Sequence, residues 1–201
     1  MKIFAATKNK NKVNEFNSLL NIQGFFVESA FNQCPEGFVV DEIGETFEEN
    51  AILKAEILAS KVNDIVFADD SGLEVMALNN KPGVFSARYG GRNATDTERM
   101  TKLLGELEVH PDRAARFVCV IAVASSKGIL GTARGEVRGT ISKELRGQNG
   151  FGYDPIFIPQ GFNKTFGELS REQKNLLSHR LRAVNNAFES GIFSFGGKDR
   201  G

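Results

Sequence analysis

Residues 65–72 read Ile65-Val66-Phe67-Ala68-Asp69-Asp70-Ser71-Gly72. A short run of β-forming residues that ends at a charged pair and a glycine predicts a buried strand that surfaces at its carboxyl end. Open α/β sheets bind their ligands at that end of their strands. We therefore expect a functional site at Asp69 and Asp70.

The two adjacent carboxylates pose an electrostatic problem. Side by side at low dielectric they repel each other, so they persist if one is protonated, if a cation lies between them, or if water reaches them. The pair therefore favours a divalent-metal site or an acid/base site. The alternative is a turn in which one aspartate caps the next element and the other is solvated.

The composition is that of one globular domain spanning residues 1–201. The chain has 41% hydrophobic residues and 25 charges of each sign, enough to bury a substantial core. A net charge of zero draws it neither to nucleic acid nor to an anionic membrane, so any anion site must come from a local cluster.

Cysteine usage and hydropathy favour a cytoplasmic location. Cys34 and Cys119 are too few and too far apart for a disulfide framework, which suggests a reducing compartment, and Cys119 is expected in the core. No stretch has the length of a membrane span, and the apolar segment at the N-terminus is too short for a signal peptide.

Sequence periodicity predicts an α/β fold with a mixed sheet. Strands are expected at residues 3–6, 25–27 and 65–69, and residues 116–124 and 129–137 form a long β-hairpin. A helix follows the first strand, with Val13, Phe16 and Leu19-Leu20 on one face. Three more helices begin at capping boxes, in which residue N3 pairs with the N-cap. These boxes are Thr46 with Glu49, Thr95 with Glu98, and Ser170 with Gln173.

A basic turn, Thr7-Lys8-Asn9-Lys10-Asn11-Lys12, separates the first strand from the first helix. Lysines at a helix N-terminus oppose the macrodipole, at about 0.3–1 kcal/mol per exposed charge, and a bound anion would reverse that effect. Backbone amides, the Thr7 hydroxyl, the Asn9 amide and a lysine form a reasonable phosphate cradle. The alternative is a solvated basic turn. With no glycine, this turn is neither a Walker loop nor a dinucleotide fingerprint.

A second acidic segment covers residues 41–50. Glu48 and Glu49 suit the start of a helix, whereas Asp41 and Glu42 have no such role. If the fold brings this loop beside Asp70, the site gains oxygen ligands of the kind that hold magnesium.

The loop Gly147-Gln148-Asn149-Gly150-Phe151-Gly152-Tyr153-Asp154-Pro155 combines spaced glycines with two aromatic rings. Its glycines allow close approach of a flat ligand, and Phe151 or Tyr153 could stack on a base. The alternative is a loop packed by its own aromatic side chains.

The last polar cluster lies near residues 174–180. Lys174 and Ser178 share a helix face, and His179 is followed by Arg180. Recognition of a ligand and a purely structural histidine both remain open.

Other chemistries fit the aspartate pair less well. Asp70-Ser71-Gly72 matches the triplet of aspartic proteases, but that chemistry needs two triplets sharing a proton, which only a symmetric dimer of this chain would supply. An aspartyl phosphatase needs aspartates separated by one residue, and a Ser-His-Asp hydrolase needs a Gly-x-Ser-x-Gly elbow. A non-enzymatic nucleotide- or RNA-binding module stays open. Against it, the acidic clusters would repel a phosphate backbone unless a metal screened them.

Taken together, these segments resemble the inosine/xanthosine triphosphate pyrophosphatase family. The similarity extends over almost the whole chain. It is carried by Ala6-Thr7-Lys8-Asn9 with Lys12, Thr46-Phe47 with Glu49-Asn50-Ala51 and Lys54-Ala55, Ala68-Asp69-Asp70-Ser71-Gly72-Leu73, Pro82-Gly83 with Ser86-Ala87-Arg88-Tyr89, Phe151-Gly152-Tyr153-Asp154-Pro155-Ile156-Phe157, and Ser178-His179-Arg180. This chain has Lys8 where the family's first motif often has glycine.

The resemblance implies an α/β fold with a long mixed twisted sheet flanked by helices, and two lobes around a central cleft. It further implies hydrolysis of ITP, dITP or XTP to the monophosphate and pyrophosphate, Mg2+ as cofactor, and a homodimer. A purine nucleoside triphosphate is then the expected partner, with neither nucleic acid nor membrane.

The resemblance also assigns roles to individual residues. Asp70 is the metal ligand and proton acceptor, with Asp41 or Glu42 as the second metal ligand, and Asp69 supports Asp70 or holds the turn. The expected triphosphate binders are Thr7, Lys8, Asn9, Lys10, Asn11 and Lys12, with Ser71 as a substrate contact. The expected nucleotide pocket comprises Phe151, Gly152, Tyr153, Asp154, Lys174, His179 and Arg180. We further hypothesise that donors near His179 and Arg180 bind the 6-keto oxygen of the base.

Overall fold

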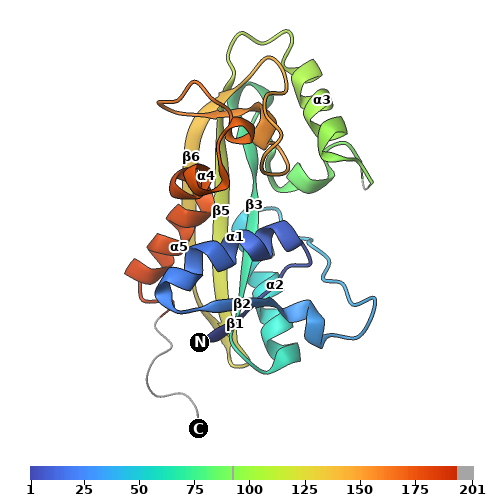
Figure 1. Ribbon diagram of the computed structural model, residues 1–201. Coiled ribbons are helices and arrows are strands. Elements are labelled where there is room, and N and C mark those ends of the chain that lie inside the picture. The colour runs from blue at the N-terminus through green and yellow to red at the C-terminus, as the bar shows by residue number, and fades with distance from the viewer. Residues whose placement is uncertain (92, 194–201) are drawn as a thin grey trace. The chain divides into compact units, whose positions relative to one another are not determined.

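The computed structural model describes residues 1–91 and 93–193 and contains a mixed sheet flanked by helices (Figure 1). The strands of the described part are β1 (Lys2–Ala5), β2 (Phe26–Ser29), β3 (Val66–Val75), β4 (Lys81–Pro82), β5 (Ala114–Ser125), β6 (Gly128–Ile141) and β7 (Phe157–Pro159). Their order is β2-β1-β3-β5-β6-β7, with β4 paired to β3. β1 runs parallel to β2 and β3, whereas β4 and β7 pair antiparallel. The predicted mixed α/β sheet is confirmed.

Three of the five helices in the described part begin at the predicted capping boxes. The helices of that part are α1 (Lys10–Leu20), α2 (Phe47–Val62), α3 (Asp96–Glu106), α4 (Arg171–Leu177) and α5 (His179–Glu189). Both hydrogen bonds of the capping box form at Thr46, Thr95 and Ser170. A further capping box, Thr165 with Glu168, was not predicted.

The helix that begins at the Ser170 capping box ends after two turns, and a second helix follows it. Ser178 has extended backbone angles, φ −70° and ψ 150°, and separates α4 from α5. It directly precedes His179, the first residue of α5, and serine is among the residues favoured at that position. The prediction that Lys174 and Ser178 share a helix face is therefore wrong, because α4 ends at Leu177.

The chain forms two compact units. Unit 1 consists of Met1–Asp70, Cys119–Gly135 and the chain from Arg180 onward, and unit 2 consists of Ser71–Val118 and Glu136–His179. The single domain over 1–201 and the central cleft stay predictions. Residues 194–201, a tail to which the sequence assigns no role, lie outside the described residues.

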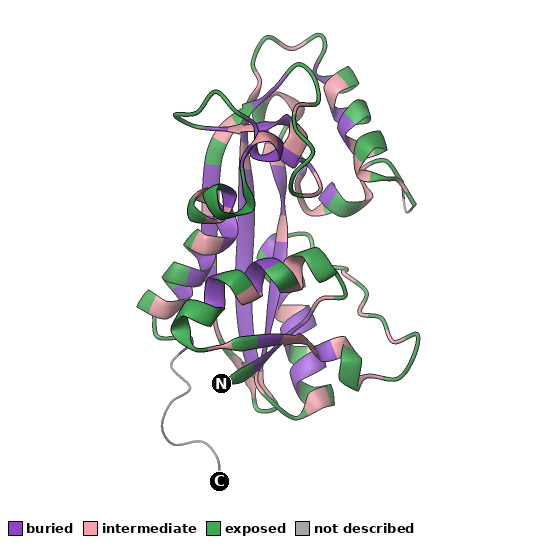
Figure 2. Cartoon of the chain, in the orientation of Figure 1, coloured by how far each residue is buried: buried purple, intermediate pink, exposed green. Residues whose placement is uncertain are grey.

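Each unit has its own apolar core. In unit 1, α1 and α5 pack on one face of the strands, where Phe16 and Ala183 share a cluster with Phe67 and Ile121. In unit 2, the core includes Leu103 of α3 together with aromatic rings such as Phe117, Phe157 and Phe166. Figure 2 shows buried residues continuing along the central strands.

β3 continues beyond the aspartate pair. The strand runs through Asp69 and Asp70 to Val75, and these aspartates are only 2% and 7% exposed. The expectation that the strand ends at Asp69 is wrong. A charged pair can remain inside a strand when cations reach it, as they do here.

Two further features concern the cysteines and the helices. Cys34 and Cys119 are free thiols, and burial raises the pKa of Cys119, as expected for a core residue. Across the described ranges, no helix combines the length and apolar character needed to cross a membrane.

Candidate active site

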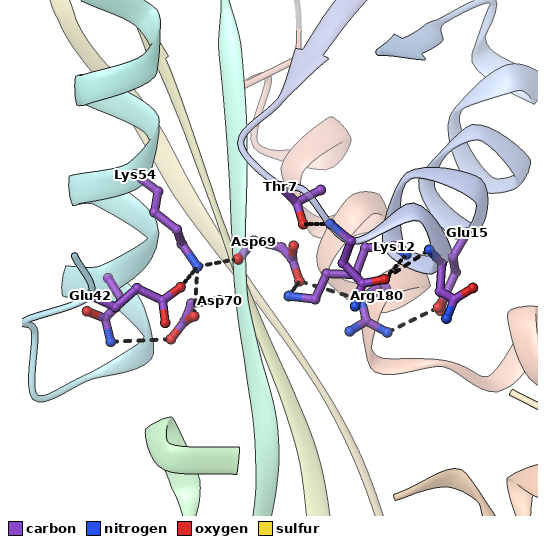
Figure 3. A network of polar contacts seen from close by, with 11 residues as sticks. Thr7, Lys12, Glu15, Glu42, Lys54, Asp69, Asp70 and Arg180 are labelled. Atoms are coloured by element: carbon purple, nitrogen blue, oxygen red, sulfur yellow. Dashed lines mark hydrogen bonds and ion pairs between the residues drawn. The ribbon is translucent and has the colours of Figure 1, made fainter. Parts of the chain in front are cut away.

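Asp69 and Asp70 point to opposite faces of β3 (Figure 3). Successive side chains of a strand alternate between faces, so neighbours in sequence are directed apart. Asp69 lies on the side of α1 and α5, and Asp70 on the side of α2. Each carboxylate therefore has its own cations, and no cation between the two is needed.

Asp69 belongs to a buried network of alternating charges. Its Oδ2 lies 2.8 Å from Lys12 Nζ and 3.5 Å from Arg180 Nε, and an Arg180 terminal nitrogen lies 3.1 Å from Glu15 Oε2. Burial by itself would raise the pKa of Asp69, but Lys12 and Arg180 outweigh it and hold the pKa below its usual value. Asp69 is therefore an ionised partner of Lys12 at neutral pH.

Asp70 shares the ammonium group of Lys54 with a second carboxylate. Lys54 Nζ lies 2.8 Å from Asp70 Oδ1, 2.7 Å from Glu42 Oε1 and 2.9 Å from the carbonyl oxygen of Asp69. The Asn50 side chain donates to Asp70 Oδ2 across 3.5 Å. Burial raises the pKa of Asp70, with Lys54 opposing part of the rise. Burial lowers the pKa of Lys54, but Asp70 and Glu42 outweigh it, so its ammonium stays charged.

Lys54 is the main site residue that residue-by-residue reasoning missed. It lies three residues after Ala51 and four before Leu58, on the buried face of α2. A lysine within the apolar stripe of an amphipathic helix needs a charged partner, and that was the available signal. Asn50 carries the same signal, because it is also fully buried on α2.

The donor set around Asp70 fits a divalent cation. Glu42 and Asp70 place two carboxylates against the single charge of Lys54, so the three side chains sum to one negative charge. Mg2+ commonly uses one or two protein carboxylates and completes its shell with water and substrate phosphates. The described ranges contain no group of three or more His, Cys, Asp or Glu side chains placed to hold a metal. Asp41 is exposed, so of the two candidates Glu42 is the one near Asp70.

The basic turn of residues 7–12, from here on called the lysine turn, contributes most of its polar side chains to the start of α1. Asn9 Oδ1 accepts from the amides of Asn11 (2.9 Å) and Lys12 (3.4 Å), and Thr7 Oγ1 accepts from the Asn9 amide. Lys8 donates to the carbonyl of Phe38. Lys10 and Asn11 are exposed, and the first turn of α1 contains no acidic residue. The first turn of α1 therefore supplies no carboxylate of its own to the positive end of the helix.

In unit 2, the glycine-rich loop is organised by a buried ion pair. Asp154 Oδ2 accepts from Lys174 Nζ at 2.7 Å and from the Phe151 amide at 2.8 Å. Lys174 Nζ lies 4.6 Å from the centre of the Phe151 ring. Gly150 has φ +77°, and a Cβ there would lie 2.0 Å from Asp154 Oδ2, so this position requires glycine. The ion pair thus fixes both the loop backbone and the Phe151 ring.

The two aromatic residues of the loop have different surroundings. Tyr153 is buried in the core of unit 2 and donates to the Ser86 carbonyl at 3.0 Å, whereas Phe151 is half-buried. The Phe151 ring is therefore the better placed of the two to meet a ligand.

The remaining predicted residues separate between the units. His179, in unit 2, is buried with its ring stacked on Phe117 at 4.8 Å. Arg180, in unit 1, contacts Glu15 and Asp69 as described above. Ser71 follows Asp70 directly in β3 and is half-buried.

The fold and the polar contacts define the class of the protein, a mixed α/β protein in which carboxylates pair with the buried lysines Lys54 and Lys174. The chain belongs to the Ham1 family, whose model matches residues 3–190. This confirms the family expected from the motifs.

Individual relatives support the assignment over nearly full length. A dITP/XTP pyrophosphatase of Desulforamulus reducens is 47% identical over 191 residues, covering 94% of each chain. One from Staphylococcus epidermidis is 46% identical over 182 residues, covering 90% of this chain and 92% of the relative.

Solved structures agree with the fold. The Staphylococcus aureus Ham1 protein matches with a TM-score of 0.83 at 44% identity, covering 95% of this chain and 99% of its own. A HAM1 protein of Coxiella burnetii matches with a TM-score of 0.84 at 39% identity, covering 94% and 98%.

Proposed function

We propose that this chain hydrolyses deaminated purine nucleoside triphosphates, namely ITP, dITP and XTP, to the monophosphate and pyrophosphate. This keeps such nucleotides out of DNA and RNA. The relatives named dITP/XTP pyrophosphatase support the activity. The structural observation that carries it is the buried cluster of Glu42, Lys54 and Asp70.

Asp70 is the proposed general base. Water attacks the α-phosphorus, Asp70 takes its proton, and the bond from the α-phosphorus to the bridging oxygen breaks, releasing pyrophosphate. A buried carboxylate with a raised pKa holds a proton more readily than an exposed one, as this step requires. Lys54 fixes the carboxylate through Oδ1. When bound, Mg2+ would be held by Glu42 and Asp70 and would supply positive charge to the phosphates.

The lysine turn is the proposed site for the triphosphate. The exposed Lys10 and the N-terminus of α1, which has no acidic residue in its first turn, support this role. Lys12 is held by Asp69, which would orient its ammonium group rather than leave it free to rotate.

Recognition of the base is assigned to unit 2. The half-buried Phe151 supports stacking, because Lys174, which is paired with Asp154, lies 4.6 Å from the centre of its ring. A site that donates to the 6-keto oxygen of hypoxanthine or xanthine would leave its donor unpaired against adenine, and such an exclusion can be steep. The ion pairs of Arg180 support a different part for that residue, in holding Asp69.

Two further expectations belong to the proposal, a location that cysteine usage favours and an oligomeric state that the family resemblance implies. The enzyme acts in the cytoplasm and works as a homodimer. Its partner is the small-molecule nucleotide.

The decisive experiment incubates the protein with ITP, ATP or single-stranded RNA, each with and without Mg2+, and measures pyrophosphate. We expect pyrophosphate from ITP only, and only with Mg2+. RNA binding without products would favour a binding module. In a separate incubation, cleavage of a peptide at acid pH would favour a protease. Equal release from ITP and ATP would contradict the proposed selectivity.

A further inference from the structure

Asp96 makes a contact that the start of its own helix does not require. It is the first residue of α3, and its Oδ2 accepts a hydrogen bond from the Gly152 amide at 2.7 Å. The N-terminus of α3 is already capped by Thr95 and Glu98, which satisfy each other's amides. The second contact therefore links α3 to the glycine-rich loop.

The hydrogen bonds of the loop amides show what this contact fixes. The Asn149 amide donates to the carbonyl of Gly167, and the Phe151 amide to Asp154. The next amide, that of Gly152, donates to the side chain of Asp96 in α3. The peptide between Phe151 and Gly152 is thus held by a carboxylate from a separate helix.

Asp96 is itself held in place. Its Oδ1 lies 2.7 Å from a terminal nitrogen of Arg99, one turn later on α3. The other terminal nitrogen of Arg99 donates to the carbonyl of Ala87, in the 3₁₀ segment η4 (Gly83–Arg88). The same segment accepts from the Tyr153 hydroxyl at Ser86. Asp96 and Arg99 thereby link α3, η4 and the glycine-rich loop within unit 2.

We propose that Asp96 is a positioning residue for the nucleobase. By fixing the peptide that follows Phe151, it sets the orientation of the half-buried Phe151 ring. A hydrogen bond to an ionised acceptor is roughly twice as strong as a neutral one, so the carboxylate holds this peptide more firmly than an amide would. This inference deepens the proposed function and rests on it, since Phe151 is there the group that stacks on the purine.

The kinetic test compares Asp96→Ala, Asp96→Asn and Glu98→Gln with ITP as substrate. We expect Asp96→Ala to raise KM by roughly tenfold and to change kcat less than about twofold, the pattern for lost binding without lost chemistry. Asp96→Asn keeps an acceptor and should raise KM less. Glu98→Gln is the matched control, because it removes a carboxylate charge from the same turn of α3 but leaves the Gly152 contact in place, and its KM should stay at the wild-type value.

A second readout does not depend on turnover. In the wild type, the Gly152 amide proton should appear downfield in an NMR spectrum and exchange slowly with solvent. In Asp96→Ala this proton should move upfield and exchange faster, whereas in Glu98→Gln it should not change. If the alanine variant fails to fold, the same measurement is made on Asp96→Asn, where a shift in the same direction is expected.

The outcomes separate this inference from the function beneath it. If the wild type hydrolyses ITP but Asp96→Ala has an unchanged KM, only the positioning role is overturned. An unchanged chemical shift and exchange rate of the Gly152 amide proton in Asp96→Ala would have the same meaning. Failure of the wild type to hydrolyse ITP would overturn the proposed function, and the role of Asp96 in recognition with it.

Discussion

At the scale of single residues, two neighbouring aspartates have cationic partners on opposite faces of β3, and their pKa values shift in opposite directions. Asp69 faces Lys12 and Arg180, which lower its pKa, whereas burial raises the pKa of Asp70. Carboxylates whose surroundings push their pKa values apart can take different roles. This difference supports the proposal that Asp70 accepts the proton while Asp69 holds the lysine turn.

Asp70→Asn should abolish turnover of ITP while the fold remains intact. The amide cannot accept the proton from water, but it has nearly the same shape, and Glu42 still balances the charge of Lys54. Pyrophosphate release and thermal unfolding should be measured together. Retained activity would place the catalytic base elsewhere.

Lys54→Met should destabilise the protein by roughly 3–5 kcal/mol, because it leaves Glu42 and Asp70 without their shared cation. A divalent cation that binds these carboxylates should compensate for the lost ammonium. Mg2+ should therefore raise the Tm of the variant more than that of the wild type. An equal response in both proteins would argue against a metal at this cluster.

His179→Ala and Arg180→Ala should have different effects. If His179 helps to recognise the base, its loss should lower the ratio of kcat/KM for ITP over ATP. Arg180→Ala should mainly lower stability, because it leaves Glu15 and Asp69 short of a buried cation. An unchanged ITP-to-ATP ratio in His179→Ala would refute the selectivity hypothesis for that residue.

At the scale of elements, short-range sequence patterns set where helices begin, whereas contacts with other elements set where β3 ends. The capping boxes at Thr46, Thr95 and Ser170 are short-range patterns and were predictable. The extension of β3 to Val75 was not, because the cations that permit it come from α1, α2 and α5.

The glycine-rich loop offers a matched pair of substitutions. Gly150 and Gly152 both have positive φ, +77° and +64°, so alanine costs about 1–2 kcal/mol of backbone strain at either. Only at Gly150 would the new Cβ also collide with the Asp154 carboxylate, while Gly152 faces open space. Gly150→Ala should therefore lower the Tm clearly more than Gly152→Ala. Equal losses would show that Asp154 moves aside freely.

At the scale of the whole molecule, acid stability should depend on Asp69. Because its folded-state pKa is below the usual 3.8, ionised Asp69 stabilises the fold above that pH, and the contribution disappears as the pH falls below it. Asp69→Asn should cost roughly 3–5 kcal/mol at pH 7. Its difference from the wild type should narrow toward pH 3 in urea unfolding.

Asp70→Asn is the control for this experiment. The raised pKa of Asp70 has the opposite sign, so its charge opposes folding at neutral pH and protonation relieves that cost. This variant should therefore lose no stability at pH 7. A loss as large as that of Asp69→Asn would contradict the assignment of the two aspartates.

The amino-acid sequence alone determined the class of fold, the family and the residue types of the site. Strand alternation, helix caps and motif spacing depend on neighbours along the chain, so they are visible before folding. The loop at Gly147–Pro155 was recognisable for the same reason.

Only the tertiary structure decided how the charges are paired. It separated Asp69 from Asp70 across a strand, placed Lys54 between Asp70 and Glu42, and directed Asp96 to Gly152. These contacts join residues that are distant in sequence. Because Coulomb and hydrogen-bond energies depend on distance and burial in space, the order of residues along the chain does not contain them.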